Sequence, residues 1–161
     1  AVRRLIAEGA LMLSQSGRVS TAELTHDRIE ELAVMRSLIE VELASRALPR
    51  AHLALIDRLK TINASVSQAI GTHDPVAYIR TNLEFHRMLY LRAQAPAMLA
   101  IAETVWLQLG PTMRSVYDKL NRKEPPHMHT TIIAALSAGD EPGLRLAVRS
   151  DVTQGLRHLL K

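Results

Sequence analysis

The sequence predicts an all-α protein: an antiparallel bundle of about six helices, preceded by a small β-hairpin. Hydrophobic residues make up 47% of the chain and aromatic residues only 3%, so the core must be built from Leu, Ala, Ile, Val and Met. Apolar side chains recur at helical spacing from residue 27 onward. The breaks between these periodic segments are only a few residues long, which favours antiparallel neighbours in a bundle.

Length and composition exclude several classes of protein. The 161 residues fit one domain of ordinary size together with a fragment of a second. There is no cysteine, so disulfides and thiolate metal sites are excluded, and we expect a cytoplasmic location. No apolar run approaches the roughly 18 residues that a membrane span needs, and we expect no membrane partner. The net charge of +4 is by itself weak evidence for a polyanionic partner.

The first 26 residues read as an N-terminal unit and a linker. Residues 1–8 resemble the end of a helix, and Gly9 is placed to terminate it. Residues 10–14 and 18–22 read as two short strands, with Gly17 supplying the positive φ of a hairpin turn. Residues 23–26 form a polar linker. We therefore place the domain boundaries at 1–22, 23–26 and 27–161.

Capping residues and prolines delimit the first three helices of the bundle. Asp27 is the predicted N-cap of the first helix, which should end near residue 48 because Pro49 disfavours helical geometry before it. The second helix should run over about 50–70, ended by Gly71. The third should begin after Asp74, with proline in its first turn, and reach about residue 94.

The last three helices follow the same signals. The fourth is predicted from Pro96 to about Arg122, kinked or divided at Gly110-Pro111. The fifth should open at Pro125-Pro126 and end at Gly139. The sixth should follow Asp140 and continue to about residue 160.

Four polar residues on three of these helices are candidate ligands for one site. Asn82 and His86 lie four residues apart and share a helix face, so they can bind one ion or ligand together, although such a pair more often forms a simple hydrogen bond. His129 begins an apolar helical run, and His127 is its rival nearer the helix end. Asp151 has apolar helical neighbours; if it is buried, its carboxylate needs a cation or hydrogen-bond donors.

Arg36 falls beside the apolar stripe of its helix. Its guanidinium should meet a carboxylate, either that of Glu40 one turn later in an internal ion pair, or that of a ligand. No nucleophile elbow, glycine-rich phosphate loop or two-histidine zinc-protease helix is present, so enzymatic motifs are lacking. A metal-dependent hydrolase or lyase built on His86 and His129 remains an alternative.

Several motifs together resemble one family. The stretch Arg36–Glu40 is similar to an arginine-x-x-leucine-glutamate motif, Asn82–His86 to an Asp-or-Asn, x, x, Phe, His motif, and residues 138–140 to a Gly-Asp turn. His129 with its following apolar residues is similar to the next histidine run of the same family. The chain thus resembles the GntR superfamily of transcriptional regulators, in its FadR-type branch with the ligand-binding FCD domain.

The resemblance implies a regulator rather than an enzyme. Residues 1–11 are similar to the end of the family's recognition helix, and residues 17–19 to the tip of its wing, with the upstream part of the winged helix-turn-helix missing. We therefore expect DNA as a partner of that winged-helix domain, with Arg3, Arg4, Gly17 and Arg18 in the DNA-binding part. A homodimer and a small organic acid effector, contacted by Arg36, are also expected.

The resemblance also implies a divalent metal ion, zinc, nickel or manganese. The family's site takes one Asp or Asn and three His, which corresponds to Asn82, His86 and His129, while the fourth position holds Asp151 instead of histidine. This departure shifts the set from nitrogen toward oxygen and weakens its preference for zinc or nickel over manganese. A third alternative is a dimerisation module with a vestigial pocket, in which these side chains satisfy one another by hydrogen bonds.

Overall fold

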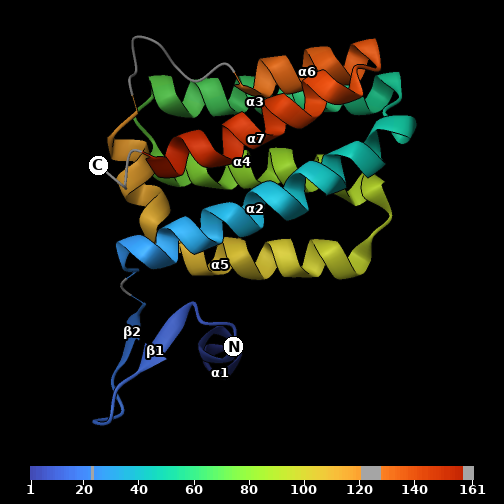
Figure 1. The fold of residues 1–161 in the computed structure, drawn as a ribbon. Helices are drawn as coiled ribbons and strands as arrows, with labels where there is room; N and C mark the ends of the chain where they lie inside the picture. The colour runs from blue at the N-terminus through green and yellow to red at the C-terminus, as the bar shows by residue number, and fades with distance from the viewer. Residues whose placement is uncertain (23, 121–127, 158–161) are drawn as a thin grey trace.

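The computed structural model describes the chain except for residues 23, 121–127 and 158–161. Within the described residues it is all-α, with seven α-helices and one two-stranded antiparallel sheet, which confirms the predicted fold class (Figure 1). The elements are α1 (Val2–Ala7), β1 (Leu11–Leu13), β2 (Val19–Thr21), α2 (His26–Ala47), α3 (Leu53–Gly71), α4 (Pro75–Tyr90), α5 (Pro96–Asp118), α6 (Met128–Ala138) and α7 (Glu141–Arg157).

The N-terminal helix and hairpin form as predicted and lie below the bundle in Figure 1. The chain leaves α1 through Gly9, whose φ of 74° is accessible to glycine at little cost. Strands β1 and β2 pair with Leu11 opposite Thr21. Gly17, at φ 80°, makes the turn between them.

The starts of α2 and α3 differ from prediction. The N-cap of α2 is Thr25 rather than Asp27: the Thr25 hydroxyl accepts the backbone N–H of Arg28, and Asp27 lies in the first turn, where its charge favours the helix dipole. Helix α3 starts at Leu53, not near residue 50, because residues 48–50 form a 3₁₀ turn and His52 caps the helix through its Nδ1.

Helix α4 ends at Tyr90, earlier than the predicted residue 94, because residues 91–93 tighten into a 3₁₀ turn and Gln94 adopts a left-handed conformation at φ 52°. Helix α5 is not divided at Gly110-Pro111. Proline removes one backbone bond to the carbonyl of Leu107. Leu107 is 39% exposed, so water can satisfy that carbonyl and the helix continues.

Helices α6 and α7 are separated by the predicted glycine turn. Gly139 has a φ of 67°, and the Asp140 carboxylate accepts the backbone N–H of Gly143 in the first turn of α7. Helix α5 ends at Asp118, with Lys119 as its C-cap, earlier than the predicted Arg122. The predicted limits of two other helices, at Pro125-Pro126 and near residue 160, lie outside the described residues. None of the helices in the described part of the chain has the length and apolar composition that crossing a membrane would require.

The six long helices enclose one main hydrophobic core. In Figure 1, α3 and α6 lie on one side of the bundle and α5 on the other, with α2, α4 and α7 between them. The largest fully buried side chains come from all of these helices, including Leu43, Leu59, Phe85, Leu109, Ile132 and Leu144. Within this apolar interior the buried polar residues are Arg36, Glu40, Thr81, His86 and His129. Because burying polar groups is costly unless they are paired, their arrangement identifies the site.

Candidate metal centre

His86, His129 and Asp151 converge inside the bundle from α4, α6 and α7. One ligand atom of each lies within 4.8 Å of the other two. His86 Nε2 is 3.0 Å from Asp151 Oδ2, and His129 Nε2 is 3.9 Å from Asp151 Oδ1. The two imidazole rings meet nearly edge to face, at an interplanar angle of 77°. Three of the four predicted ligands are therefore close enough to bind one ion.

A hydrogen-bond chain fixes the orientation of the His86 ring. The Tyr90 hydroxyl donates to Glu40 Oε2 at 3.0 Å, so its oxygen is left to accept from His86 Nδ1, 3.2 Å away. The proton of neutral His86 therefore sits on Nδ1, and the lone pair of Nε2 points toward the cluster. This is the arrangement in which proteins hold histidine ligands of metal ions.

His129 is held in the same tautomer by different partners. Its Nδ1 lies 3.2 Å from Oδ1 of Asn63 on α3, an acceptor. In this orientation the Asn63 amide nitrogen faces Thr130 Oγ1 at 3.5 Å. Phe85 stacks on the imidazole at a centroid distance of 3.8 Å and an angle of 10°. The aromatic residue of the Asn82–His86 motif thus positions the histidine of the other helix.

The Nε2 atoms of both histidines are buried and make no hydrogen bond of acceptable geometry. Although His86 Nε2 is near Asp151 Oδ2, the angle does not suit a proton between them. A buried nitrogen without a partner is costly, whereas a shared cation would satisfy both lone pairs and the carboxylate. The donor set therefore fits a divalent metal ion.

Burial and the charges around the cluster favour a neutral His129 and an ionised Asp151. Burial lowers the pKa of His129 to about 4, with Asp151 opposing this and His86 reinforcing it, so the ring is neutral near neutral pH. Burial works against ionisation of Asp151, but the neighbouring His86, His129 and Arg36 hold the pKa of its carboxyl below the usual range. Neutral imidazoles and an ionised carboxylate are the forms that bind metal.

Arg36 forms the internal ion pair that was one of its two predicted outcomes. Its Nε and Nη2 donate to the two oxygens of Glu40, at 2.5 and 3.1 Å. Glu40 is fully buried and also accepts from the Trp106 indole at 2.8 Å. Burial opposes its charge, but Arg36 outweighs this and lowers the pKa of Glu40. An organic acid would therefore have to use the donors that Glu40 leaves free, on Nη1 and the second N–H of Nη2.

Asn82 lies one turn before His86 on the same face of α4 and is half-buried. The rival histidine, His127, lies outside the described residues. The spacing argument missed Tyr90, although it lies four residues after His86 and shares its face. Asn63 and Trp106 approach from other helices, and no local pattern marks them.

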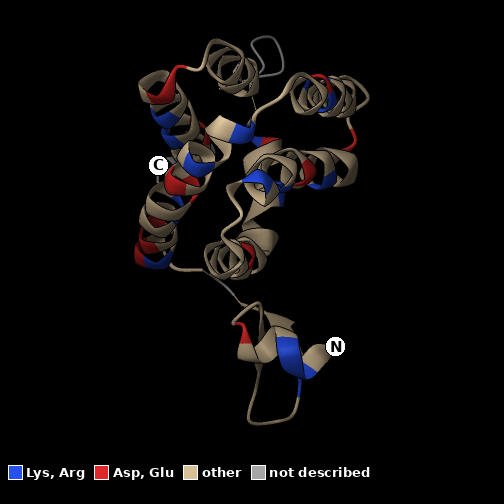
Figure 2. Ribbon diagram, turned by 90° about the vertical axis from the view of Figure 1, so that its right-hand side faces the viewer, with Lys and Arg blue, Asp and Glu red and all other residues tan. Residues whose placement is uncertain are grey.

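The predicted DNA-binding residues all lie in the N-terminal unit. Arg3 and Arg4 are exposed on α1, where Figure 2 shows basic residues, and Arg4 pairs with Glu8 at 2.8 Å. Gly17 makes the hairpin turn, and the neighbouring Arg18 is exposed. These four residues are remote in sequence from the buried cluster, and none of the contacts described above connects them to it.

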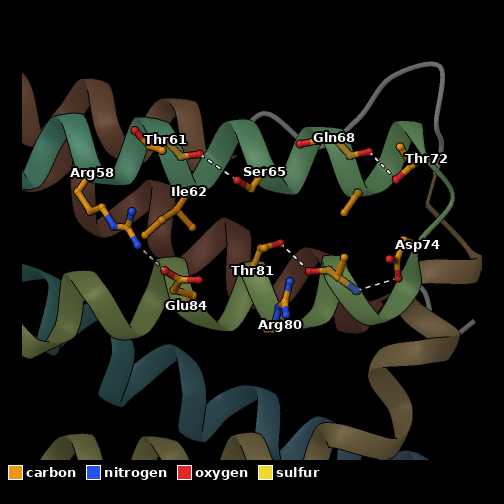
Figure 3. A pocket seen from close by; sticks show the side chains of 12 residues that line it. Arg58, Thr61, Ile62, Ser65, Gln68, Thr72, Asp74, Arg80, Thr81 and Glu84 are labelled. Carbon is orange, nitrogen blue, oxygen red and sulfur yellow. Dashed lines mark hydrogen bonds and ion pairs between the residues drawn. The ribbon is translucent and has the colours of Figure 1, made fainter.

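A polar cavity of about 410 Å³ lies between α3 and α4 (Figure 3). An ion pair crosses it, with Arg58 Nη2 2.9 Å from Glu84 Oε1. The residues that line it include neither of the cluster's histidines nor Asp151. This groove is therefore separate from the candidate metal centre.

Comparison with known proteins identifies the family. The FCD domain family model matches residues 31–154. The chain is 25% identical to the HTH-type transcriptional regulator McbR of Escherichia coli (strain K12) over 161 residues, covering 97% of this chain and 72% of that protein.

Solved structures show the same fold. E. coli McbR/YncC superposes with a TM-score of 0.87 at 22% identity, covering 99% of this chain and 80% of that one. A GntR family transcriptional regulator from Pseudomonas syringae pv. tomato str. DC3000 superposes with a TM-score of 0.69 at 14% identity, covering 98% and 66%. With most of its length matched by the domain model, the chain belongs to the FCD family of GntR-type transcriptional regulators.

Proposed function

We propose that this regulator senses a small organic acid through a divalent metal ion held by His86, His129, Asp151 and Asn82. The observation that carries the proposal is the pair of buried, unpartnered Nε2 atoms that face one carboxylate. Two neutral imidazoles, one amide and one carboxylate leave the set with a charge of about −1, so a divalent cation would leave the site net positive. A bound ion would supply that charge and an open coordination position for a carboxylate.

The polar environment supports an acidic effector. Arg36 adds a permanent charge close enough to Asp151 to help lower the pKa of that carboxyl. Burial, reinforced by the charge of Asp151, raises the pKa of Tyr78 on α4 to about 12, so its hydroxyl stays protonated and can donate. Tyr78, Asn82 and His86 follow one another at four-residue spacing on α4 and face the same way.

In the proposed scheme, residues 1–22 belong to a winged-helix DNA-binding domain, and residues 27–161 form the sensor and dimerisation domain of a homodimer. An effector changes DNA affinity only by as much as its affinity differs between two arrangements of these domains. The alternative of a dimerisation module with a vestigial pocket requires the cluster to satisfy itself by hydrogen bonds. The unpartnered Nε2 atoms of His86 and His129 are inconsistent with this alternative.

Metal content and effector response test the proposal separately. We expect about one equivalent of zinc, nickel or manganese by elemental analysis of the purified protein, and loss of it in His86→Ala. His73→Asn is the matched control, because His73 is exposed and its φ of 58° suits asparagine. Thermal-shift measurements with small organic acids should then show stabilisation only in the metal-loaded protein. Absence of metal from the wild type after reconstitution would overturn the metal site.

A further inference from the structure

We propose that Gln108 of α5 positions the N-terminal unit, residues 1–22, on the bundle. Its side-chain amide makes two hydrogen bonds to different parts of the chain. Nε2 donates to the backbone carbonyl of Glu8 at 3.1 Å, and Oε1 accepts from Arg28 Nη2, at the start of α2, at 2.9 Å. Because the amide group is planar, the two bonds together fix the position of the Glu8 carbonyl, at the end of α1, relative to α2 and α5.

The backbone of the N-terminal unit is shaped to approach this glutamine. Glu8 is the C-cap of α1, and Gly9 follows in a left-handed conformation. A Cβ on Gly9 would lie 3.3 Å from Gln108 Nε2, a distance at which the amide would have to move. Ala10, the next residue, is only 7% exposed. The close approach is therefore confined to a short stretch of backbone.

Apolar packing contributes little to holding α1 in place. None of the residues of α1 is buried. Instead, Arg4 and Glu8 line one wall of a cavity of about 740 Å³, whose other walls are α4 and α5. A helix held over an open cavity takes its orientation from a few polar contacts. This makes the two hydrogen bonds of Gln108 decisive for where the N-terminal unit sits.

The same helix also reaches the candidate metal centre. Trp106, two residues before Gln108, donates to Glu40, and Glu40 accepts from the tyrosine that orients His86. A displacement of α5 relative to α2 would therefore strain the Glu40 contacts and the Gln108 contacts together. The Gln108 contacts form whether or not an ion occupies the cluster.

Distance measurement between two spin labels tests the role of Gln108. The chain has no cysteine, so Ser16→Cys in the hairpin and Ala64→Cys on α3, both exposed positions, give unique attachment points. We expect one narrow distance distribution in the parent and a broadened or displaced one in Gln108→Ala. Gln108→Glu keeps the size of the side chain and the bond to Arg28 but cannot donate to Glu8, so it should have the same effect. If Gln108 only filled space, Gln108→Glu would leave the distance distribution unchanged.

Gln68→Ala is the control, since it removes an exposed glutamine from α3, which lies on the opposite side of the bundle from the N-terminal unit in Figure 1. Circular dichroism confirms that each variant is folded. If Gln108→Ala fails to fold, the isosteric Gln108→Glu variant decides alone. A distribution unchanged in the folded Gln108 variants, or one already broad in the parent, would overturn the proposal.

Discussion

Tyr90→Phe tests the hydrogen-bond chain that prepares His86 for a metal. The substitution removes one oxygen and leaves the fully buried ring in place. Glu40 keeps its donors from Arg36 and Trp106, so its charge remains compensated. His86 Nδ1 loses its acceptor, and a buried orphan N–H costs about 1–3 kcal/mol. We therefore expect the metal-free protein to lose roughly 2 kcal/mol of unfolding free energy in denaturant titration.

Tyr90→Phe should also weaken metal binding, because Tyr90 fixes which nitrogen of His86 carries the proton. Without Tyr90, His86 loses the contact at Nδ1 that holds its Nε2 lone pair toward the cluster. Loss of such an outer partner weakens metal affinity by about 10- to 100-fold, as measured by chelator competition. Tyr117→Phe, which alters an equally buried phenol in a separate hydrophobic cluster, should leave affinity unchanged. A folded Tyr90→Phe protein with wild-type affinity would refute the reasoning.

Three further expectations concern the same interior. Asp151→His should raise the preference for zinc over manganese in competition titrations, because it replaces an oxygen ligand by nitrogen. An unchanged ratio of zinc to manganese affinity would mean that Asp151 is not a ligand. Glu40→Gln should cost about 3–5 kcal/mol in denaturant titrations, because Arg36 is left buried and unpaired, and Arg36→Met in the same chain should recover much of it. Burial and the charge of Asp151 raise the pKa of Tyr78 to about 12, against about 10 in the unfolded chain, so ionisation of Tyr78 disfavours the fold, and wild type should lose roughly 3 kcal/mol of unfolding free energy relative to Tyr78→Phe as the pH rises from 10 toward 12. The difference in unfolding free energy between wild type and Tyr78→Phe should accordingly move against wild type over this pH range, and a difference that does not change with pH would contradict this.

The fold was predictable because the ends of its helices and strands are determined by residues close in sequence. Gly9, Gly17 and Gly139 adopt the positive φ that their positions suggested, and each ends or turns an element. One error arose where two residues close in sequence offer the same chemistry. Thr25 and Asp27 can both cap a helix, and only the backbone geometry, which places the Thr25 hydroxyl at the N–H of Arg28, decides between them.

The candidate site was predictable only in part. Helical spacing and family resemblance together indicated His86, His129 and Asp151, and the structure brings these three together. His129 is oriented by Asn63, 66 positions away in sequence, and the tyrosine that orients His86 is itself held by Glu40, 50 positions before that tyrosine. Such contacts depend on which helices pack together, and a pattern within one helix carries no information about that.

The energetics of the Gln108 contact suit a switch between two arrangements of the N-terminal unit. The bond from Gln108 to the Glu8 carbonyl joins the N-terminal unit to the bundle and contributes about 1 kcal/mol, whereas the bond from Arg28 holds Gln108 against α2. Allosteric coupling free energies are commonly about 1–3 kcal/mol. A contact stabilised by the main core would be too strong for a small molecule to open, and one without these bonds would not hold a defined orientation. Since α1 buries none of its residues, its position can respond to a ligand whose affinities for the two arrangements differ by about 5-fold.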